Sequence, residues 1–279
     1  MNDPVLVGVD GSEASLAAVD VGVREARLRG CGLKVVHAFI WPLMHVSLGP
    51  SPNGPAEGGL RHQAEDVLAD ARRRARELDP DLHVDTELVT GEPLGVLAGR
   101  SRGACLVVVG SRGLGRFSAL LIGSVAVHLA AHAACPVLIV RGRPEPEGDV
   151  LVAVDGSGVG AEAVGFAFAE ASVRRAPLTA LHAWHSHTGR LDRAERVPEE
   201  AVVGWREKYP DVDVRTRLVE QHTRPALIEA SRGAQLLVVG ARGRGGFAGL
   251  MLGSTSQAVI QHADCPVAVV RHTEPAEPA

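Results

Sequence analysis

One glycine pattern occurs twice in this chain and constrains its fold more than any other feature. Gly-x-x-Gly, nine further residues and Gly-Ser span residues 110–124 and again 240–254. Each copy follows an apolar run and leads into a segment typical of a helix. Glycine allows main-chain N–H groups to approach an anion closely, and a helix start adds unpaired N–H groups. A single short pattern also fits a plain strand-to-helix turn, but its repetition favours two phosphate-binding sites.

The repetition extends over most of the chain. VGVDGS at 7–12 matches VAVDGS at 152–157, and HAACPVLIVR at 132–141 matches HADCPVAVVR at 262–271. The spacing between copies falls from 145 residues at the first block to 130 at the later ones, so the first half carries about fifteen extra residues. These fall in the Gly- and Pro-rich segment 40–60. A lid over the site and a tolerated surface insertion are both open interpretations of that segment.

Short β-branched runs alternate with helical periodicity in both halves, which predicts parallel strands covered by helices and therefore an α/β fold. The strands are expected at 5–9, 33–39, 83–89, 105–110 and 137–141, then near 150–154, 178–184, 212–218, 235–240 and 267–271. The helices are expected at about 14–29, 60–78, 93–102 and 124–132, then near 160–175, 197–208, 225–232 and 254–262. Ligands of such sheets bind beyond the carboxyl ends of the strands, where the winding direction changes.

The repeat predicts two domains, at 1–143 and 148–273, with a seam in the Pro- and Gly-rich stretch 141–149 and a disordered tail at 274–279. The formal net charge of −4 and the pI near 6.3 favour neither nucleic acid nor an anionic membrane as a partner. No apolar run approaches the roughly 18 residues of a membrane span, and the first residues do not resemble a signal peptide. We therefore expect a cytoplasmic protein.

Metal centres built from cysteine or histidine are not expected. The four cysteines lack CxxC spacing and a paired histidine cluster, which argues against a zinc site or a disulfide framework. His37 and His182 recur with the repeat at the ends of elements, as structural residues do.

Asp10 and Asp155 stand at equivalent places, each at the end of the first strand of its half. A carboxylate there can accept hydrogen bonds from ribose hydroxyls or hold a Mg²⁺ ion that neutralises phosphates. It can also cap the following helix or form an Asx turn with the Gly-Ser that follows. Duplication beside the glycine pattern favours the ligand role.

These motifs together resemble the universal stress proteins in their tandem two-domain form. The resemblance rests on V-x-V-D-G-S, L-x-x-x-H-A, the duplicated glycine loop and the final C-P-V strand, and it covers nearly the whole chain. It implies two tandem open five-stranded parallel sheets with covering helices, Rossmann-like and similar to the adenine-nucleotide α-hydrolase fold. It also implies pairing of the two domains within the chain through the last strands, 137–141 and 267–271. Because family members often dimerise, a homodimer is a further expectation.

The same resemblance implies ATP as the ligand, with Mg²⁺ at the phosphates. The glycines, serines and the residue after each serine would surround the phosphates and ribose, and the two alanines would meet the adenine. In the first half the matching residues are Asp10, Ala38, Gly110, Gly113, Gly123, Ser124 and Val125. In the second half they are Asp155, Ala183, Gly240, Gly243, Gly253, Ser254 and Thr255.

Turnover of ATP is a separate matter. The sequence has no Walker lysine and no S-G-G-x-D-S signature of ATP pyrophosphatases. We therefore expect a nucleotide-dependent stress-response regulator rather than an enzyme. A slow Mg-dependent ATPase and a non-catalytic interaction protein without nucleotide are the alternatives.

The arginines of the glycine loops have two open interpretations, contact with phosphate and a solvated position. These residues are Arg112, Arg116, Arg242 and Arg244.

Overall fold

The computed structural model describes residues 3–40, 59–113, 123–142, 147–185, 191–243 and 252–272. The chain forms two compact units, Met1–Leu129 and Ala130–Ala279. Residues 41–58 of the Gly- and Pro-rich segment 40–60, the tail from residue 273 and residues 143–146 of the expected seam lie outside the described residues. The domain boundaries expected from the repeat remain a prediction.

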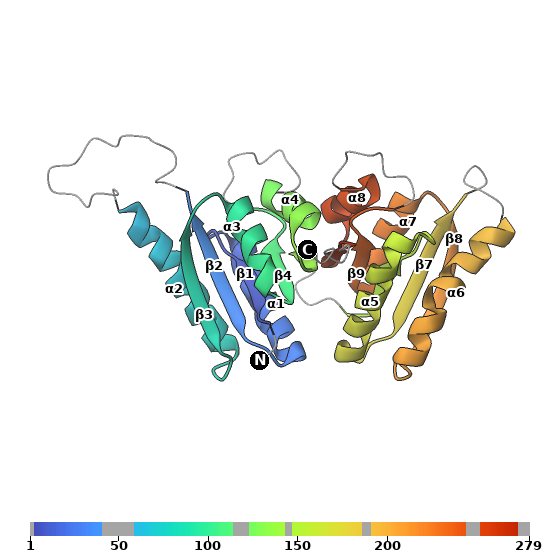
Figure 1. Ribbon diagram of the computed structural model, residues 1–279, viewed down its shortest axis with the longest axis horizontal. Coiled ribbons are helices and arrows are strands. Elements are labelled where there is room, and N and C mark those ends of the chain that lie inside the picture. The colour runs from blue at the N-terminus through green and yellow to red at the C-terminus, as the bar shows by residue number, and fades with distance from the viewer. Residues whose placement is uncertain are drawn as a thin grey trace, which may run out of the picture. The chain divides into compact units, whose positions relative to one another are not determined.

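The first unit is a parallel sheet with helices packed on it (Figure 1). Its described strands run in the order β3-β2-β1-β4. They are β1 Val5–Gly8, β2 Leu33–Phe39, β3 Val84–Thr90 and β4 Leu106–Gly110. The helices are α1 Glu13–Arg29, α2 Leu60–Leu78 and α3 Pro93–Arg100, with a 3₁₀ turn at Ser101–Gly103; α4, Ser124–His132, ends in the second unit.

The second unit repeats this plan and adds two strands, β10 and β5. Its described strands run in the order β5-β10-β9-β6-β7-β8. They are β5 Val137–Val140, β6 Asp149–Ala153, β7 Leu178–Trp184, β8 Val214–Glu220, β9 Ala234–Gly240 and β10 Val267–Val270. The helices are α5 Ala161–Arg174, α6 Leu191–Lys208, α7 Thr223–Ala230 and α8 Ser254–His262, with 3₁₀ turns at Gly158–Gly160 and Ser231–Gly233. The five strands from β6 to β10 are parallel, which confirms the expected α/β fold.

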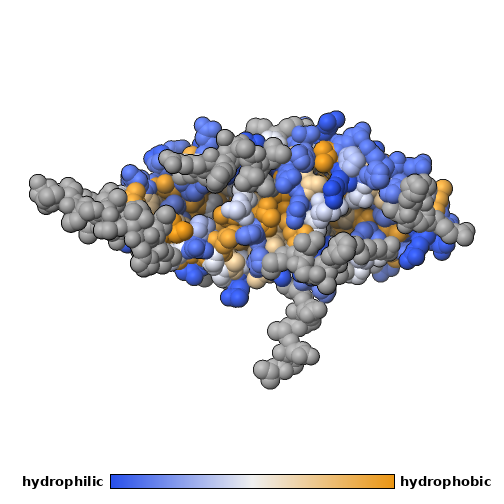
Figure 2. Space-filling model, turned by 90° about the horizontal axis from the view of Figure 1, so that it is seen from above, coloured by the Kyte–Doolittle hydropathy of each residue, from blue (hydrophilic) through white to orange (hydrophobic). Residues whose placement is uncertain are grey.

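The central strands form the core of each unit. In β4 the residues from Leu106 to Val109 are at most 4% exposed, as expected for a strand covered on both faces. Strand order reverses after β8, so right-handed crossovers place α5 and α6 on one face and α7 and α8 on the other. Contacts between α5 and α6 and between α7 and α8 agree with this arrangement. In the space-filling view, hydrophilic and hydrophobic residues lie side by side on the visible face of each unit (Figure 2).

The last strands of the two repeats pair with each other, as the resemblance implied. Strand β5 runs antiparallel to β10, with Val137 opposite Val269. Two equivalent arginines reinforce this pairing. Arg141 donates to the carbonyl of Ile260, and Arg271 Nη1 donates to the carbonyl of Ala133 at 3.0 Å. An additional homodimer remains a prediction.

The expected positions of α6, α7 and β8 were wrong. Helix α7, Thr223–Ala230, lies two residues toward the N-terminus of its expected range. Helix α6 begins at Leu191 rather than near residue 197, so Pro198 lies inside it. Proline there removes one helical hydrogen bond, and proline is best tolerated in the first turn of a helix. The helix continues because it buries Ala194, Val197 and Val202 against the sheet, and such packing contributes more than local propensity. Strand β8 is shifted two residues toward the C-terminus of its expected range.

Candidate functional site

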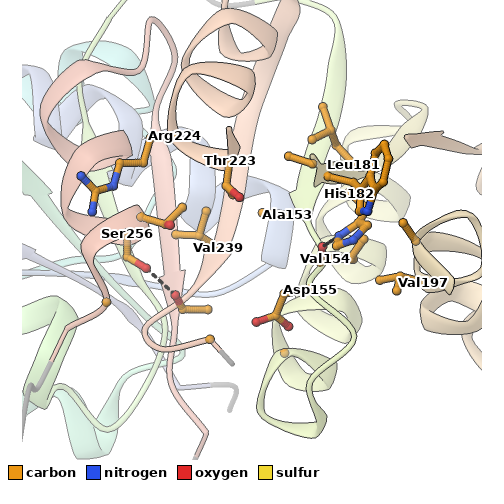
Figure 3. A pocket seen from close by; sticks show the side chains of 18 of the residues that line it. Ala153, Val154, Asp155, Leu181, His182, Val197, Thr223, Arg224, Val239 and Ser256 are labelled. Carbon is orange, nitrogen blue, oxygen red and sulfur yellow. Dashed lines mark hydrogen bonds between the residues drawn. The ribbon is translucent and has the colours of Figure 1, made fainter. Parts of the chain in front are cut away.

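The candidate sites lie where the strand order of each unit reverses. Strand β6 lies between β7 and β9, so the carboxyl ends of β6 and β9 are neighbours although far apart in sequence. Asp155 follows β6, and Gly240 ends β9. At this edge the second unit has a cleft of about 1450 Å³ (Figure 3). Ligands of open parallel sheets bind at this topological position.

All seven residues expected at the second site line this cleft. They are Asp155, Ala183, Gly240, Gly243, Gly253, Ser254 and Thr255. The structure thus brings together residues that follow β6, lie in β7, end or follow β9 and begin α8, which the sequence separates by up to 100 positions. Contact with a nucleotide remains a prediction.

The Asp155 carboxylate is held by its own turn. Its Oδ1 accepts hydrogen bonds from the Ser157 amide at 2.9 Å and from the Ser157 hydroxyl at 2.6 Å. Gly156 has a φ of 70°, which glycine adopts without strain. The Asx turn considered as the alternative role of Asp155 therefore exists. It engages Oδ1, whereas Oδ2 lies close to Gly243 in the cleft.

A histidine from β7 supports the same corner. Nδ1 of His182 lies 2.7 Å from the carbonyl oxygen of Val154, the residue before Asp155, and as the protonated nitrogen it donates to that oxygen. Figure 3 shows this hydrogen bond and the Asp155 carboxylate beyond it. Leu181, which lines the cleft, accepts the Val154 amide hydrogen at 2.9 Å through its carbonyl. The strand end that carries the aspartate is therefore fixed to β7.

The glycine loop is anchored at both of its described ends. The Gly253 amide donates to the carbonyl of Ala241 at 2.8 Å, and the Ser256 hydroxyl donates to the carbonyl of Gly240 at 2.7 Å (Figure 3). Gly253 is the N-cap of α8, and within the described residues no side chain caps this helix start. Ser254, the first helical residue, is exposed. The first turn of α8 therefore offers uncapped N–H groups to the cleft.

The universal stress protein family model matches this chain twice, at residues 1–141 and 148–271. The chain belongs to the universal stress protein family. A universal stress protein of Mycobacterium tuberculosis strain H37Rv is 37% identical over 287 residues, which cover 96% of each chain. One of Mycolicibacterium smegmatis is 37% identical over 292 residues and also covers 96% of each chain. The crystal structure of a universal stress protein from Archaeoglobus fulgidus matches the fold with a TM-score of 0.75 at 22% identity, covering 97% of each chain.

The first unit of this universal stress protein repeats the same geometry. Asp10 Oδ1 accepts from the Ser12 amide at 3.0 Å and from the Ser12 hydroxyl at 2.6 Å. Asp10 Oδ2 lies close to Gly113, and the Gly123 amide donates to the carbonyl of Ser111 at 2.9 Å. Nδ1 of His37 lies 2.8 Å from the carbonyl oxygen of Val9.

The remaining first-site residues occupy matching elements. Gly110 ends β4 and packs so closely on α1 that a Cβ atom would stand 2.6 Å from the carbonyl oxygen of Ala14. Ser124 and Val125 begin α4, and Ala38 lies in β2. The aspartate turns, the histidine contacts and the loop anchors are therefore equivalent in the two repeats, whereas a Cβ atom on Gly240 would stand closest to the carbonyl oxygen of Arg242, at 2.9 Å.

Several cleft residues of the second unit were not expected from the sequence. Arg242 lines the cleft, as one of its two interpretations required, whereas Arg116 and Arg244 lie outside the described residues. The unexpected residues from α6 and α7 include Arg193, Arg196, Thr223 and Arg224. In the sequence these residues look like any solvent-exposed face of a helix. The signal that could have indicated them is that the second repeat has arginines where the first repeat has none.

The described residues contain no group of three or more histidine, cysteine or acidic side chains arranged to hold a metal ion. A metal at the cleft would therefore need ligands from a bound molecule as well as from Asp155. None of the described helices combines the length and apolarity that crossing a membrane requires.

Proposed function

We propose that this universal stress protein binds an adenine nucleotide, ATP, in the glycine loop of each repeat. The observation that carries the proposal is the second-unit cleft, which gathers a carboxylate, a glycine loop and an uncapped helix start at one sheet edge. These are the groups that recognise ribose and phosphate. Equivalent residues recur in the first unit, with Val125 in place of Thr255.

Each part of the cleft suits one part of the nucleotide. The phosphates would lie against the first turn of α8, with the Ser254 and Thr255 hydroxyls as donors. Asp155 Oδ2, which lies close to Gly243 in the cleft, would accept from the ribose hydroxyls. The adenine would lie near Ala183 in β7, beside apolar Leu181. A flat apolar wall with few polar groups is typical of such pockets.

Mg²⁺ fits this donor set when phosphate is present. The ion prefers oxygen ligands and retains water, and it is held in proteins by one or two carboxylates together with phosphates. Asp155 in the second unit and Asp10 in the first would supply the protein carboxylate. The bound ion would neutralise phosphate charge.

We propose that nucleotide binding regulates the protein's interactions and does not supply a substrate for catalysis. A nucleotide would connect the loop, the β6 corner and the start of α8, and such a connection favours one conformation of the loop over others. A conformational preference of this kind would change which partner the protein binds. The sequence lacks the P-loop lysine, which argues against efficient hydrolysis of ATP. A slow Mg-dependent ATPase is the second candidate function, and the test below distinguishes it from binding alone.

The test is direct quantification of bound nucleotide. The purified protein is denatured, released nucleotides are separated by ion-exchange chromatography, and the stripped protein is titrated with Mg-ATP. We expect up to two ATP per chain, and about one per chain in Gly113→Val or Gly243→Val. ADP formed in excess over protein would instead indicate an ATPase. No nucleotide and no heat of binding would exclude the proposal and leave an interaction role.

A further inference from the structure

The second-unit cleft carries arginines that the first unit lacks. Its four lining arginines are Arg193 and Arg196 from α6, Arg224 from α7, and Arg242 after β9. All four are exposed, and none of them forms an ion pair with a residue of the described ranges; Arg196 Nε donates to the backbone carbonyl of Asp192 at 3.3 Å. Their guanidinium groups are therefore available to a ligand.

The first unit offers a matched reference, because α2 and α6 occupy equivalent places. Helix α2 packs on β2 and β3, and α6 packs on β7 and β8. AEDV at 64–67 aligns with AERV at 194–197. Val67 faces the turn beside Asp10, with its Cγ2 3.0 Å from the position of a Cβ on Gly11, and Val197 lines the second-unit cleft. The same helical turns therefore face both sites.

At these equivalent positions the charge differs. The first unit has Gln63, Asp66 and Leu94 where the second has Arg193, Arg196 and Arg224. Arg112 matches Arg242, and one acidic residue matches another at Asp70 and Glu200. Acidic Asp192, opposite His62 of the first unit, partly offsets the difference. The second site is therefore the more cationic of the two.

Hydroxyl groups follow the same trend. Two positions beside the glycine loop carry Thr255 and Ser256 in the second unit but Val125 and Ala126 in the first. Thr255 lines the cleft and can donate to phosphate, whereas the Ser256 hydroxyl donates to the carbonyl of Gly240. The second site thus has both more positive charge and one more donor.

We propose that the two sites discriminate by phosphate charge. The second-unit site is the polyphosphate site, where the α6 and α7 arginines add affinity for each further phosphate. The first-unit site, with Asp66 in place of an arginine, discriminates less between ATP and a nucleotide with fewer phosphate charges, such as a nucleoside monophosphate. The inference rests on the proposed nucleotide binding. Interaction with a fixed charge grows with the ligand's charge and weakens with salt, so the arginines favour triphosphate over monophosphate most strongly at low ionic strength.

The experiment exchanges the charges between the repeats in the full chain. In a Gly113→Val background, which leaves the second site, Arg193→Gln, Arg196→Asp and Arg224→Leu are combined. In a Gly243→Val background, which leaves the first site, Gln63→Arg, Asp66→Arg and Leu94→Arg are combined. Each protein is titrated with ATP and with AMP at two salt concentrations. A control with Arg215→Gln, Arg217→Asp and Arg232→Leu makes the same change of charge at exposed positions that do not line the cleft.

We expect the ratio of ATP affinity to AMP affinity to be at least about tenfold higher at the second site than at the first. The exchange should lower that ratio at the second site and raise it at the first, with AMP affinity changing least and the control behaving as the parent. Equal ratios at both sites, or a ratio unchanged by the exchange, would overturn this inference and leave the proposed function standing. Absence of all nucleotide binding at both sites would overturn both.

Discussion

The Oδ2 atom of Asp155 lies 2.6 Å from the position that a Cβ atom would take on Gly243. Asp10 and Gly113 have the same close approach in the first unit. Real Cβ atoms essentially never lie this close to another atom, so glycine is the residue that lets the loop pass directly over the carboxylate. The two residues are 88 positions apart, and the relationship links the aspartate turn to the glycine loop in both repeats.

Gly243→Ala should separate the loop from the carboxylate. We expect nucleotide affinity at the second site to fall at least about tenfold, because the added methyl group must displace either the loop or the Asp155 side chain. Gly243 is exposed, so thermal stability should change little. Calorimetric titration of the nucleotide-free parent and variant measures the affinity of each protein for Mg-ATP. Gly233→Ala, exposed and with nothing within 4 Å of its Cβ position, is the matched control. Full affinity in Gly243→Ala would contradict the proposed role of this approach.

His182→Leu should loosen the corner that carries Asp155. The substitution removes the 2.7 Å hydrogen bond to the carbonyl of Val154 and should cost about 1 kcal/mol in the free energy of unfolding. Nucleotide affinity should fall as well, since the strand end that positions the carboxylate is less constrained. Urea unfolding followed by circular dichroism measures the first effect. His62→Leu, at an exposed position of α2, should stay within about 0.5 kcal/mol of the parent. A similar loss in both variants would show that the hydrogen bond is not the cause.

Gly165 of α5 lies against the ring of Trp205 of α6, where a Cβ atom would overlap the indole. Trp205 also stacks near Phe168, with ring centroids 6.2 Å apart. Gly165→Val should therefore lower the free energy of unfolding by about 1–3 kcal/mol through overpacking. Gly204→Ala, one residue before the tryptophan and facing open space, should raise it by about 0.5–1 kcal/mol through helix propensity. Thermal unfolding of both variants tests the pair, and a neutral Gly165→Val would refute the tight packing.

Glu87 of β3 should make the free energy of unfolding depend on pH in the acid range. Arg100 donates to its carboxylate, with Nε 3.0 Å from Oε2, and Lys34 Nζ lies 2.9 Å from Oε2. The hydrogen bonds from Arg100 and then Lys34 lower the pKa of Glu87 from 4.5 to about 2. The folded state therefore holds the charged form more strongly than the unfolded chain does. This contribution is complete above about pH 4.5 and is lost as the pH falls toward 2.

Glu87→Gln should flatten that part of the pH profile. Because all three side chains are partly exposed, the difference between the parent and the variant at neutral pH should be no more than about 1 kcal/mol. Urea midpoints measured from pH 6 down to pH 2 provide the comparison. Parallel profiles for the two proteins would show that these ion pairs do not contribute.

Local patterns predicted most of the fold. Runs such as that from Leu106 to Val109 are apolar on both faces, which is the signature of a buried parallel strand, and the structure buries them. The start of α6 was missed because the cost of Pro198 is local and visible in the sequence, whereas the packing that offsets it is not.

The sequence by itself determined the duplication, the alternation of strands and helices, and which residue types follow the strands, because these depend on short-range pattern and on backbone preferences. Only the tertiary structure decided that Asp155 lies against Gly243 and that Arg193, Arg224 and Arg242 line the same cleft. These residues belong to four different segments, and their meeting depends on β6 lying beside β9 while α6 and α7 cover opposite faces of the sheet. Such contacts arise from strand order and crossover handedness, which involve residues too distant in the chain for any local pattern to encode.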